Sequence, residues 1–487
     1  MAHTPPAGVP IKIDSTSNGE FFPLPIGRTL ARANQIAAHR ITQNAGRTGR
    51  SRRAFMASLC GAATALLTFD EAFAARGNVG GRFRVGPDAA FDEDAAAQVL
   101  AGNEFIFDIQ THMVEPDGPW RNGPSRGWAD RLARWPQGDC GEIDAVDCYS
   151  SDHFIKEVFL DSDTDMAVLS FVPTAPGQNP LSMFEAARVR DLIEKLDGTD
   201  RLLLHNGVMP KYQSVQAMVD GMAESAATYD LAAWKVYTQF GPDGTGWWLD
   251  DDEVGIPFIE QARALGIRTI CIHKGLPFGG LDPQFAGCED VGRVARMFPD
   301  VKFIIFHSGY QTTHREGPYV PGTAHVGIDT LIQSLLDNGV APNSNVYAEL
   351  GSTWRSLIRN PTAAAQGLGK LLKYVGRSNL LWGTDSIWYG SPQDQIQAFR
   401  AFEISEELRE RHGYPDLTPD LKAKILGLNA AAVFGVNPVR MQDRAAADPI
   451  GHLKMDFAAA RQPSFGTYGP RTAAEFRYFT RLKAGRY

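Results

Sequence analysis

Short runs of apolar residues recur along the chain from residue 103 onward and alternate with segments of helical periodicity. The runs are continuous and rich in β-branched and aromatic residues, which is typical of parallel strands buried on both faces. They predict strands at residues 104–109, 166–173, 202–205, 233–237, 269–273, 303–307, 346–350 and 380–383. The apolar spacing between most of them predicts helices at residues 181–196, 215–229, 257–265, 291–298, 330–337 and 363–375. A strand–helix unit repeated roughly eight times predicts a (β/α)8 TIM barrel of the α/β class.

An open, doubly wound sheet is the alternative architecture for the same alternation. Such a sheet carries a glycine-rich phosphate-binding turn after its first strand, and the segment FDIQTHMVEP (residues 107–116) contains no glycine. We therefore expect a barrel at residues 103–437, with long strand-to-helix loops at 114–165 and 240–254 that are suited to form lids and substrate pockets. Residues 438–487 are rich in aromatics and arginines and are expected to wrap the barrel or a partner subunit as a C-terminal extension.

The first 74 residues have the features of an export signal. Arg52-Arg53 precedes an apolar run at residues 57–69, which is followed by the small-residue motif Ala72-Phe73-Ala74. This order is typical of a twin-arginine signal with a long leader, and it predicts cleavage after Ala74 and a leader that lies outside the fold. Residues 75–102 would then be a linker, the twin-arginine export machinery a partner, and the mature protein periplasmic or secreted. A buried N-terminal helix preceded by two chance arginines is the alternative.

Charge and cysteine content narrow the choice of partners. The formal net charge is −8, and the leader carries an excess of four positive charges, so the mature part would carry −12. An acidic body without basic patches disfavours nucleic acid, and no stretch reaches the roughly 18 apolar residues of a membrane span. Cleavage would remove Cys60 and leave four cysteines, of which Cys140 and Cys148 could form a disulfide in an oxidising compartment. Free thiols are the alternative, and the lack of a C-x-x-C pair disfavours a structural zinc site.

Polar residues stand where several of the apolar runs end: Gln110, His112, Lys235, His273, His307 and Asp385. The carboxyl ends of barrel strands meet on one face, and Gln110 and His112, two residues apart, share one side of a strand. Imidazole and carboxylate suit zinc, iron or manganese, and a catalytic ion needs about three protein ligands and an open position. The ligands would be His112, His273 and Asp385, with Gln110 as a weak fourth. We therefore expect a metal-dependent enzyme that acts on a small molecule.

These residues resemble the motifs of the amidohydrolase superfamily, and most closely its ACMSD-like branch, amidohydrolase 2. The family pattern is H-x-H ending strand one, a lysine ending strand four in many binuclear members, single histidines ending strands five and six, and an aspartate ending strand eight. The matching positions are Gln110-Thr111-His112, Lys235, His273, His307 and Asp385. The segment ILGLNAAAVFGV (residues 425–436) resembles the terminal I-x-G-x-N-A-x-x-x-F/Y-G helix. The resemblance implies a TIM barrel and, as in many members of the branch, a homodimer.

The chain departs from the family pattern at one position and raises a question at another. Gln110 replaces the first histidine of H-x-H, and its amide oxygen is a poor zinc ligand compared with imidazole. This favours one metal ion over two, with zinc first and manganese or iron as alternatives. Lys235 cannot stay charged and unpaired cheaply in a barrel mouth. It could be carbamylated and bridge two metals, or it could pair with a carboxylate or a substrate anion.

The leading hypothesis for the reaction is hydrolysis of a small-molecule amide, lactone or cyclic ester by metal-activated water. Asp385 would act as the base, and His307 and Lys235 would polarise the carbonyl or hold the developing anion. Non-oxidative decarboxylation of an aromatic or unsaturated carboxylic acid, an activity common in the ACMSD-like branch, is the first alternative. A barrel that has lost a ligand and only binds a small molecule or partner is the second.

Further positions are weaker candidates for a role in the site. Asp108, behind His112, is expected to support the ligands from outside the site. His205 and Glu349, at the ends of the third and seventh strands, fit pocket lining and packing equally well. Trp247-Trp248 is expected to be buried packing, with an apolar lid wall as the alternative.

Overall fold

Eight parallel strands form the centre of the protein in the computed structural model, which describes residues 8–122, 140–175, 177–242, 244–277, 283–322, 325–447, 449–458, 465 and 469–483. The strands are β2 (Phe107–Thr111), β3 (Met166–Leu169), β4 (Leu202–Gly207), β5 (Ala233–Tyr237), β6 (Thr269–His273), β7 (Lys302–Phe306), β8 (Val346–Glu349) and β9 (Leu380–Leu381). Each pairs with the next in chain order. Backbone amides of Asp385 and His112 donate to the carbonyl oxygens of Gln110 and Ser386 and join β2 to the segment after β9. The sheet therefore closes into the predicted barrel.

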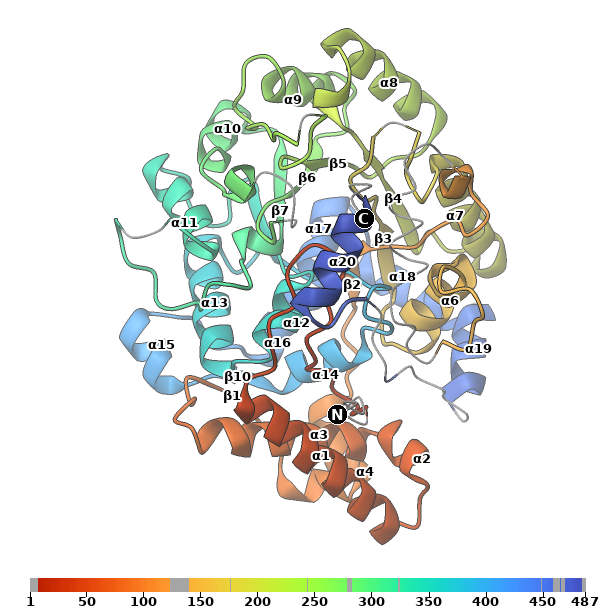
Figure 1. Cartoon of the computed structure of the whole chain (residues 1–487), viewed down its shortest axis with the longest axis vertical. Coiled ribbons are helices and arrows are strands. Elements are labelled where there is room, and N and C mark those ends of the chain that lie inside the picture. The colour runs from red at the N-terminus through yellow and green to blue at the C-terminus, as the bar shows by residue number, and fades with distance from the viewer. Residues whose placement is uncertain are drawn as a thin grey trace.

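Helices surround the barrel (Figure 1). Those between the strands are α7 (Met183–Asp197), α8 (Val215–Thr228), α9 (Gly255–Ala264), α10 (Val291–Met297), α11 (Ile328–Asp337) and α13 (Pro361–Tyr374). Local signals set their ends: Ser182 accepts a hydrogen bond from the Glu185 amide at the start of α7, and Gly198 ends that helix with a φ of 64°. Strands β5 and β6 have the predicted bounds, and these six helices differ from the predicted bounds by no more than two residues. The predicted α/β barrel is confirmed.

Further helices lie in the loops and after the last strand: α6 (Ser151–Phe154), α12 (Thr353–Leu357), α14 (Gln393–Ala401), α15 (Glu406–His412), α16 (Pro419–Ala423) and α17 (Asn429–Phe434). A π-helical turn at Lys424–Leu428 joins α16 to α17. Ala430 and Val433 of α17 pack with Phe105 and Phe107 at the beginning of the first barrel strand. The end of the barrel where the strands begin is thus filled with apolar side chains, so the polar strand ends lie at the opposite mouth.

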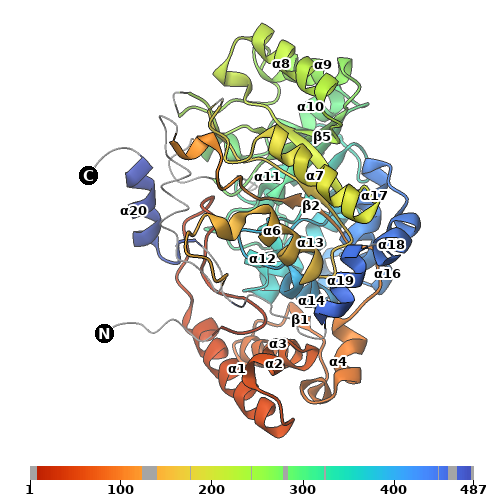
Figure 2. The ribbon, with the colours of Figure 1, turned by 90° about the vertical axis from the view of Figure 1, so that its right-hand side faces the viewer.

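Residues 8–102 are folded against the barrel in this structure of the full chain, as in the alternative of a buried N-terminal helix, and the division into a leader (1–74) and a linker (75–102) stays a prediction. The segment contains α1 (Arg28–Arg47), α2 (Arg52–Met56), α3 (Leu59–Ala74) and α4 (Glu93–Leu100), which lie together on one side of the barrel (Figure 2). Strand β1 (Gly81–Phe83) pairs antiparallel with β10 (Phe402–Ile404). The apolar run assigned to the signal is α3, in which Leu66 and Phe69 are fully buried, so the fold itself removes this apolar surface from water. Twin-arginine export and cleavage after Ala74 remain predictions.

The chain before α1 crosses the barrel mouth, and we call residues 9–21 the N-terminal arm. Its apolar side chains Ile11 and Ile13 are buried. The Lys12 ammonium donates to the carbonyl oxygens of Tyr389 (2.8 Å) and Ser391 (3.0 Å). Apolar burial and these hydrogen bonds anchor the arm to loops of the barrel.

The C-terminal extension lies along the barrel and over the arm. It contains α18 (Pro438–Ala447), α19 (Pro449–Ala458) and α20 (Ala473–Lys483). Helix α20 lies in front of the barrel mouth (Figure 1), where the rings of Phe476 and Phe22 are 4.6 Å apart. The Ser17 amide also donates to the carbonyl oxygen of Pro470 at 2.9 Å. The N-terminal segment and the C-terminal extension therefore meet above the strand ends.

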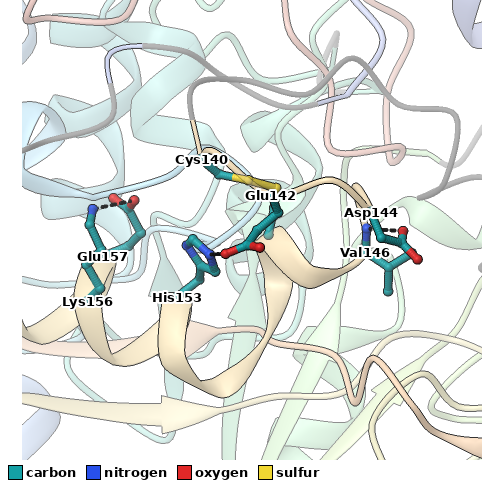
Figure 3. The surroundings of a disulfide bond; sticks show 8 residues. Cys140, Glu142, Asp144, Val146, His153, Lys156 and Glu157 are labelled. Carbon is teal, nitrogen blue, oxygen red and sulfur yellow. Dashed lines mark hydrogen bonds and ion pairs between the residues drawn. A yellow bond between two sulfur atoms is a disulfide. The ribbon is translucent and has the colours of Figure 1, made fainter.

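Cys140 and Cys148 form a disulfide in the loop between β2 and β3 (Figure 3). Their Cα atoms are 5.9 Å apart, an ordinary spacing for a disulfide. Beside it, Nε2 of His153 lies 2.9 Å from a carboxylate oxygen of Glu142. Part of the predicted lid loop, residues 123–139, lies outside the described residues. Within the described chain, no helix is long and apolar enough to cross a membrane.

Candidate functional site

The polar residues that mark the strand ends are all buried in the barrel. Gln110 lies in β2, Lys235 in β5 and His273 at the end of β6. His112 directly follows β2, His307 directly follows β7, and Asp385 follows the short segment after β9. Five of the six side chains have no exposed surface, and His112 is 1% exposed. Such groups are buried together only when they satisfy one another or a ligand.

Five of these residues form one connected cluster. Nε2 of Gln110 donates to Oδ1 of Asp385 at 2.7 Å, and Nε2 of His112 lies 3.1 Å from the same oxygen. Nε2 of Gln110 also lies 3.4 Å from Nε2 of His307, which in turn lies 3.2 Å from Nδ1 of His273. Side chains from four different strand ends therefore converge on one point.

Backbone carbonyls orient the rings of His273 and His307. Nδ1 of His307 lies 2.6 Å from the carbonyl oxygen of Gly351, and Nε2 of His273 lies 3.4 Å from that of Leu276. Because a carbonyl only accepts, we assign the ring protons to these two nitrogens. Nε2 of His307 and Nδ1 of His273 then carry lone pairs that face one another. Facing lone pairs repel unless a proton or a cation lies between them, and metal-binding histidines are oriented in this way.

The N-terminal arm adds a carboxylate to the cluster. The two carboxylate oxygens of Glu20 lie 3.7 Å from Nδ1 of His273 and 3.7 Å from Nε2 of His307. Ligand atoms of these three residues lie within 4.8 Å of one another. The sequence reasoning missed Glu20, because the only local signal is an acidic residue after Asn18-Gly19, which is common in turns.

Hydrogen bonds hold Asp385 on both of its oxygens. Oδ2 accepts from Oγ of Ser352 at 2.5 Å and from Nδ2 of Asn18 at 3.0 Å, while Oδ1 accepts from Gln110. The Ser352 hydroxyl also lies 2.8 Å from the hydroxyl of Tyr389. Asn18 and Ser352 were missed as well. Asn18 lies before the predicted barrel, and Ser352, two residues after the predicted strand at 346–350, carries only a hydroxyl group, which is a weak signal for a site.

Two buried carboxylates support the cluster from behind. Glu349 accepts hydrogen bonds from the amides of His307 (3.0 Å) and Gly351 (2.5 Å) and so holds His307, whose φ is 64°. Asp108 accepts from the amides of Gln110 and Thr384, both at 3.1 Å. Asp108 therefore lies where the sequence places it, and Glu349 positions His307 through its backbone.

Burial and mutual charge set the protonation of the cluster. Burial lowers the pKa of His307 to about 4 and that of His273 well below its ordinary value. Burial and the nearby Asp385 raise the pKa of Glu20 well above its ordinary value. Burial opposes ionisation of Asp385, but its hydrogen bonds with His112 and Ser352 help to bring its pKa below the ordinary value. At neutral pH, the imidazoles of His273 and His307 are neutral and Asp385 is ionised.

Lys235 lies in the barrel interior against two aromatic rings. Its ammonium has no hydrogen-bond partner among the described residues. It lies 3.5 Å from the ring centroid of Phe306 and 4.8 Å from that of Tyr237. Burial lowers the pKa of Lys235 to about 8, so roughly a tenth of the amine is neutral at pH 7. A neutral amine is the form that reacts with carbon dioxide or a carbonyl group.

The weaker candidates lie beside the cluster. Nδ1 of His205 is 3.3 Å from the Ser170 hydroxyl, and its Nε2 is 3.5 Å from Sγ of Cys271, so it is a satisfied interior histidine. Trp247 is buried, and the ring of Trp248 packs 4.9 Å from that of Phe285. These contacts fit packing and do not place the two tryptophans over the cluster.

Several solved structures resemble this chain at low sequence identity. The solved structures that resemble this one include the 5-carboxyvanillate decarboxylase of Sphingomonas paucimobilis, which is 14% identical with a TM-score of 0.43 over 69% of this chain and 100% of that one. A 2,6-dihydroxybenzoate decarboxylase from Rhizobium is 14% identical with a TM-score of 0.39 over 68% of this chain and 99% of that one. A proposed 2-pyrone-4,6-dicarboxylic acid hydrolase from Pseudomonas putida is 15% identical with a TM-score of 0.38 over 69% of this chain and 98% of that one.

A search of curated proteins finds no match. The sequence profile of the family described as Amidohydrolase (Amidohydro_2) matches residues 185–436, which is more than half of the chain and includes Lys235, His273, His307 and Asp385. This protein therefore belongs to the amidohydrolase family, in its amidohydrolase-2 branch.

Proposed function

We propose that this protein is a metal-dependent hydrolase that cleaves a small-molecule amide, lactone or cyclic ester. The observation that carries the proposal is the 3.2 Å approach of Nδ1 of His273 and Nε2 of His307, to which we assign facing lone pairs, buried beside the carboxylate of Asp385. Nδ1 of His112 is also buried and has no hydrogen-bond partner within the described residues. Neutral imidazoles and a carboxylate around one point fit zinc first, and also manganese or iron.

His112, His273 and Asp385 would hold one ion, and the geometry adds His307 to this set. When bound, the ion supplies Lewis acidity that brings the pKa of water close to neutrality. Asp385 is ionised and accepts a proton from the attacking water, then returns it to the leaving group. Hydrogen bonds from Gln110 and Ser352 aim its two oxygens, so the base does not have to reorient during the reaction.

Lys235 stabilises the negative charge that forms during the reaction. Its cation stabilises negative charge that develops on the substrate carbonyl oxygen, in a barrel interior where water does not screen it. Carbamylation by carbon dioxide is the alternative use of its partly neutral amine. Intact mass measurement of the native protein distinguishes the two, because a carbamate adds the mass of one carbon dioxide.

The hydrolase proposal is tested by assaying the zinc-loaded and the metal-free protein on a panel of lactones, cyclic esters and amides. We expect acid release, followed in a pH-stat, only from the loaded enzyme, and its loss in Asp385→Asn. Zinc-loaded protein that hydrolyses no member of the panel, or metal-free protein that hydrolyses as fast, contradicts the proposal.

One observation favours decarboxylation as a second candidate. The Glu20 carboxylate lies between His273 and His307, so the cluster accommodates a carboxylate of the kind that a decarboxylase must bind. The substrate would be an aromatic or unsaturated carboxylic acid. Release of carbon dioxide from hydroxybenzoates by the zinc- or manganese-loaded enzyme, with no activity on the lactone panel, would replace the hydrolase proposal by this one.

A further inference from the structure

We propose that Glu20 is a ligand of the catalytic metal together with His273 and His307, which makes the N-terminal arm a permanent part of the catalytic centre. This inference deepens the proposed function and rests on the metal dependence proposed there. Residues at the ends of barrel strands normally hold the metal in such a site. Here one ligand would come from a segment about 90 residues before the first barrel strand.

The position of Glu20 is the first observation. Its two carboxylate oxygens lie at the same distance, 3.7 Å, from the facing nitrogens of His273 and His307. The Glu20 side chain is 8% exposed, and one of its oxygens accepts a hydrogen bond from Asn18 at 2.7 Å. Ligand atoms within 4.8 Å of one another need to move by only about 1 Å to reach the 2.0–2.2 Å bonds of zinc.

The donor set of the barrel explains why a further carboxylate is needed. Gln110 turns its amide nitrogen toward Asp385 and His307, and an N–H group cannot be a metal ligand. The remaining barrel ligands are neutral imidazoles and the single negative charge of Asp385. A divalent cation buried in the barrel is electrically balanced by two carboxylates, and Glu20 supplies the second.

The loop at the tip of the arm is built to present Glu20. The Glu20 amide donates to Oδ1 of Asn18 at 3.0 Å, and the Ser17 hydroxyl donates to the carbonyl oxygen of Phe21 at 2.5 Å. Gly19 has a φ of 94°, a conformation that other residues rarely adopt. Nδ2 of Asn18 also donates to Asp385 and so ties the tip to the opposite side of the site.

The stem of the arm is anchored too firmly for a plug that leaves during each turnover. Lys12 pairs with Asp394 at 3.7 Å, and both side chains are less than 10% exposed. Asp14 pairs with Arg355 at 2.6 Å. Release of the arm would expose these partners and the buried Ile11 and Ile13, and separating one buried ion pair already costs about 3–5 kcal/mol. The arm is therefore retained in the working protein, and cleavage after Ala74 would remove a ligand.

The experiment compares zinc affinity in full-length Glu20→Gln, Glu71→Gln and the wild type, each made metal-free and titrated with zinc against a chromogenic chelator. Glu71 is an exposed carboxylate of the same N-terminal region that pairs with Arg40, so its variant controls for the chemical change alone. We expect Glu20→Gln to weaken zinc binding by about 100-fold or more and Glu71→Gln to leave it unchanged. Zinc affinity of Glu20→Gln within twofold of wild type overturns the inference. A Glu20→Gln variant that keeps its zinc affinity and hydrolyses faster than wild type also overturns the inference, because the arm would then block the site.

A second measurement applies even where Glu20→Gln fails to fold. A crystal structure of the wild-type chain soaked with zinc, with the ion located by anomalous scattering, shows its ligands directly. A Glu20 oxygen bonded to the ion supports the inference, whereas an ion held by barrel residues alone overturns it. Both measurements are independent of turnover, so absence of hydrolysis would refute the proposed reaction and leave the assignment of Glu20 intact.

Discussion

Replacement of Lys235 by methionine tests whether this buried cation is kept for function at the expense of stability. Its ammonium is fully buried and has no hydrogen-bond partner in the described part of the chain. Methionine has a similar length and no charge. We therefore expect Lys235→Met to stabilise the metal-free protein at pH 7 and to lower kcat by about 100-fold, because charge on the substrate oxygen is no longer stabilised.

The size of the stability gain follows from the pKa of Lys235, which burial lowers from 10.5 to about 8. This difference corresponds to about 3 kcal/mol in favour of the unfolded state when the amine is charged. The contact with the Phe306 ring returns about 1–2 kcal/mol. We therefore expect the variant to gain about 1–2 kcal/mol in the free energy of unfolding.

The stability advantage of Lys235→Met over the wild type depends on pH. Below pH 8 the amine is charged in both states, and the wild type carries the full destabilisation. Between pH 8 and 10.5 the unfolded chain binds more protons than the folded one, so wild-type stability rises with pH and the advantage of the variant is lost. Urea unfolding of both proteins in chelator, at pH 7 and at pH 10, measures this difference.

Lys274→Met is the matched control. Lys274 follows β6 and is equally buried, but its ammonium lies 3.0 Å from Asp290. Its loss leaves a buried carboxylate unpaired, so we expect this variant to lose about 3–5 kcal/mol. If Lys235→Met is less stable than wild type at pH 7, or if its advantage persists at pH 10, then Lys235 is paired or carbamylated in the folded protein and the reasoning is refuted.

Three further variants test the base, the arm and the disulfide. Asp385→Asn should lower kcat by about 10²–10⁴-fold, and near wild-type kcat contradicts the base role. The variant should also lose about 1–3 kcal/mol in the free energy of unfolding, because the NH2 group of the introduced amide would then face the NH2 group of Gln110. Lys12→Met should cost about 3–5 kcal/mol by leaving Asp394 without its cation, and an unchanged Tm contradicts the anchor. Cys148→Ser should cost about 2–3 kcal/mol only in the absence of reductant, and equal loss with reductant contradicts a stabilising disulfide.

The barrel could be predicted because its signals are local. A run such as Thr269–His273 is apolar throughout since both faces of the strand are buried, and the chain shows this over five residues. The predicted first strand, at 104–109, differs from β2 (Phe107–Thr111). Phe105 is apolar because it packs with α17 residues beneath the barrel, and apolar character alone does not separate that contact from pairing.

The site could be predicted in part for the same reason. Strand ends of a barrel meet at one mouth whatever the loops do, so His112, His273, His307 and Asp385 were identifiable as neighbours. The direction in which a side chain points could not be predicted, because it depends on hydrogen bonds with residues from other strands. Gln110 was expected to offer its oxygen, but hydrogen bonds with Asp385 and His307 turn its nitrogen to the site.

The sequence by itself therefore determined the barrel, the order of its strands and the polar residues at the mouth where the strands end, because hydrophobic periodicity and strand ends are properties of short segments. Only the tertiary structure showed that residues 8–74 of the full chain pack against the barrel and that Glu20 lies beside His273 and His307. The apolar run read as a signal is a buried helix, and Asn18 reaches Asp385 across 367 residues. Such contacts depend on where distant segments pack, and no local pattern records them.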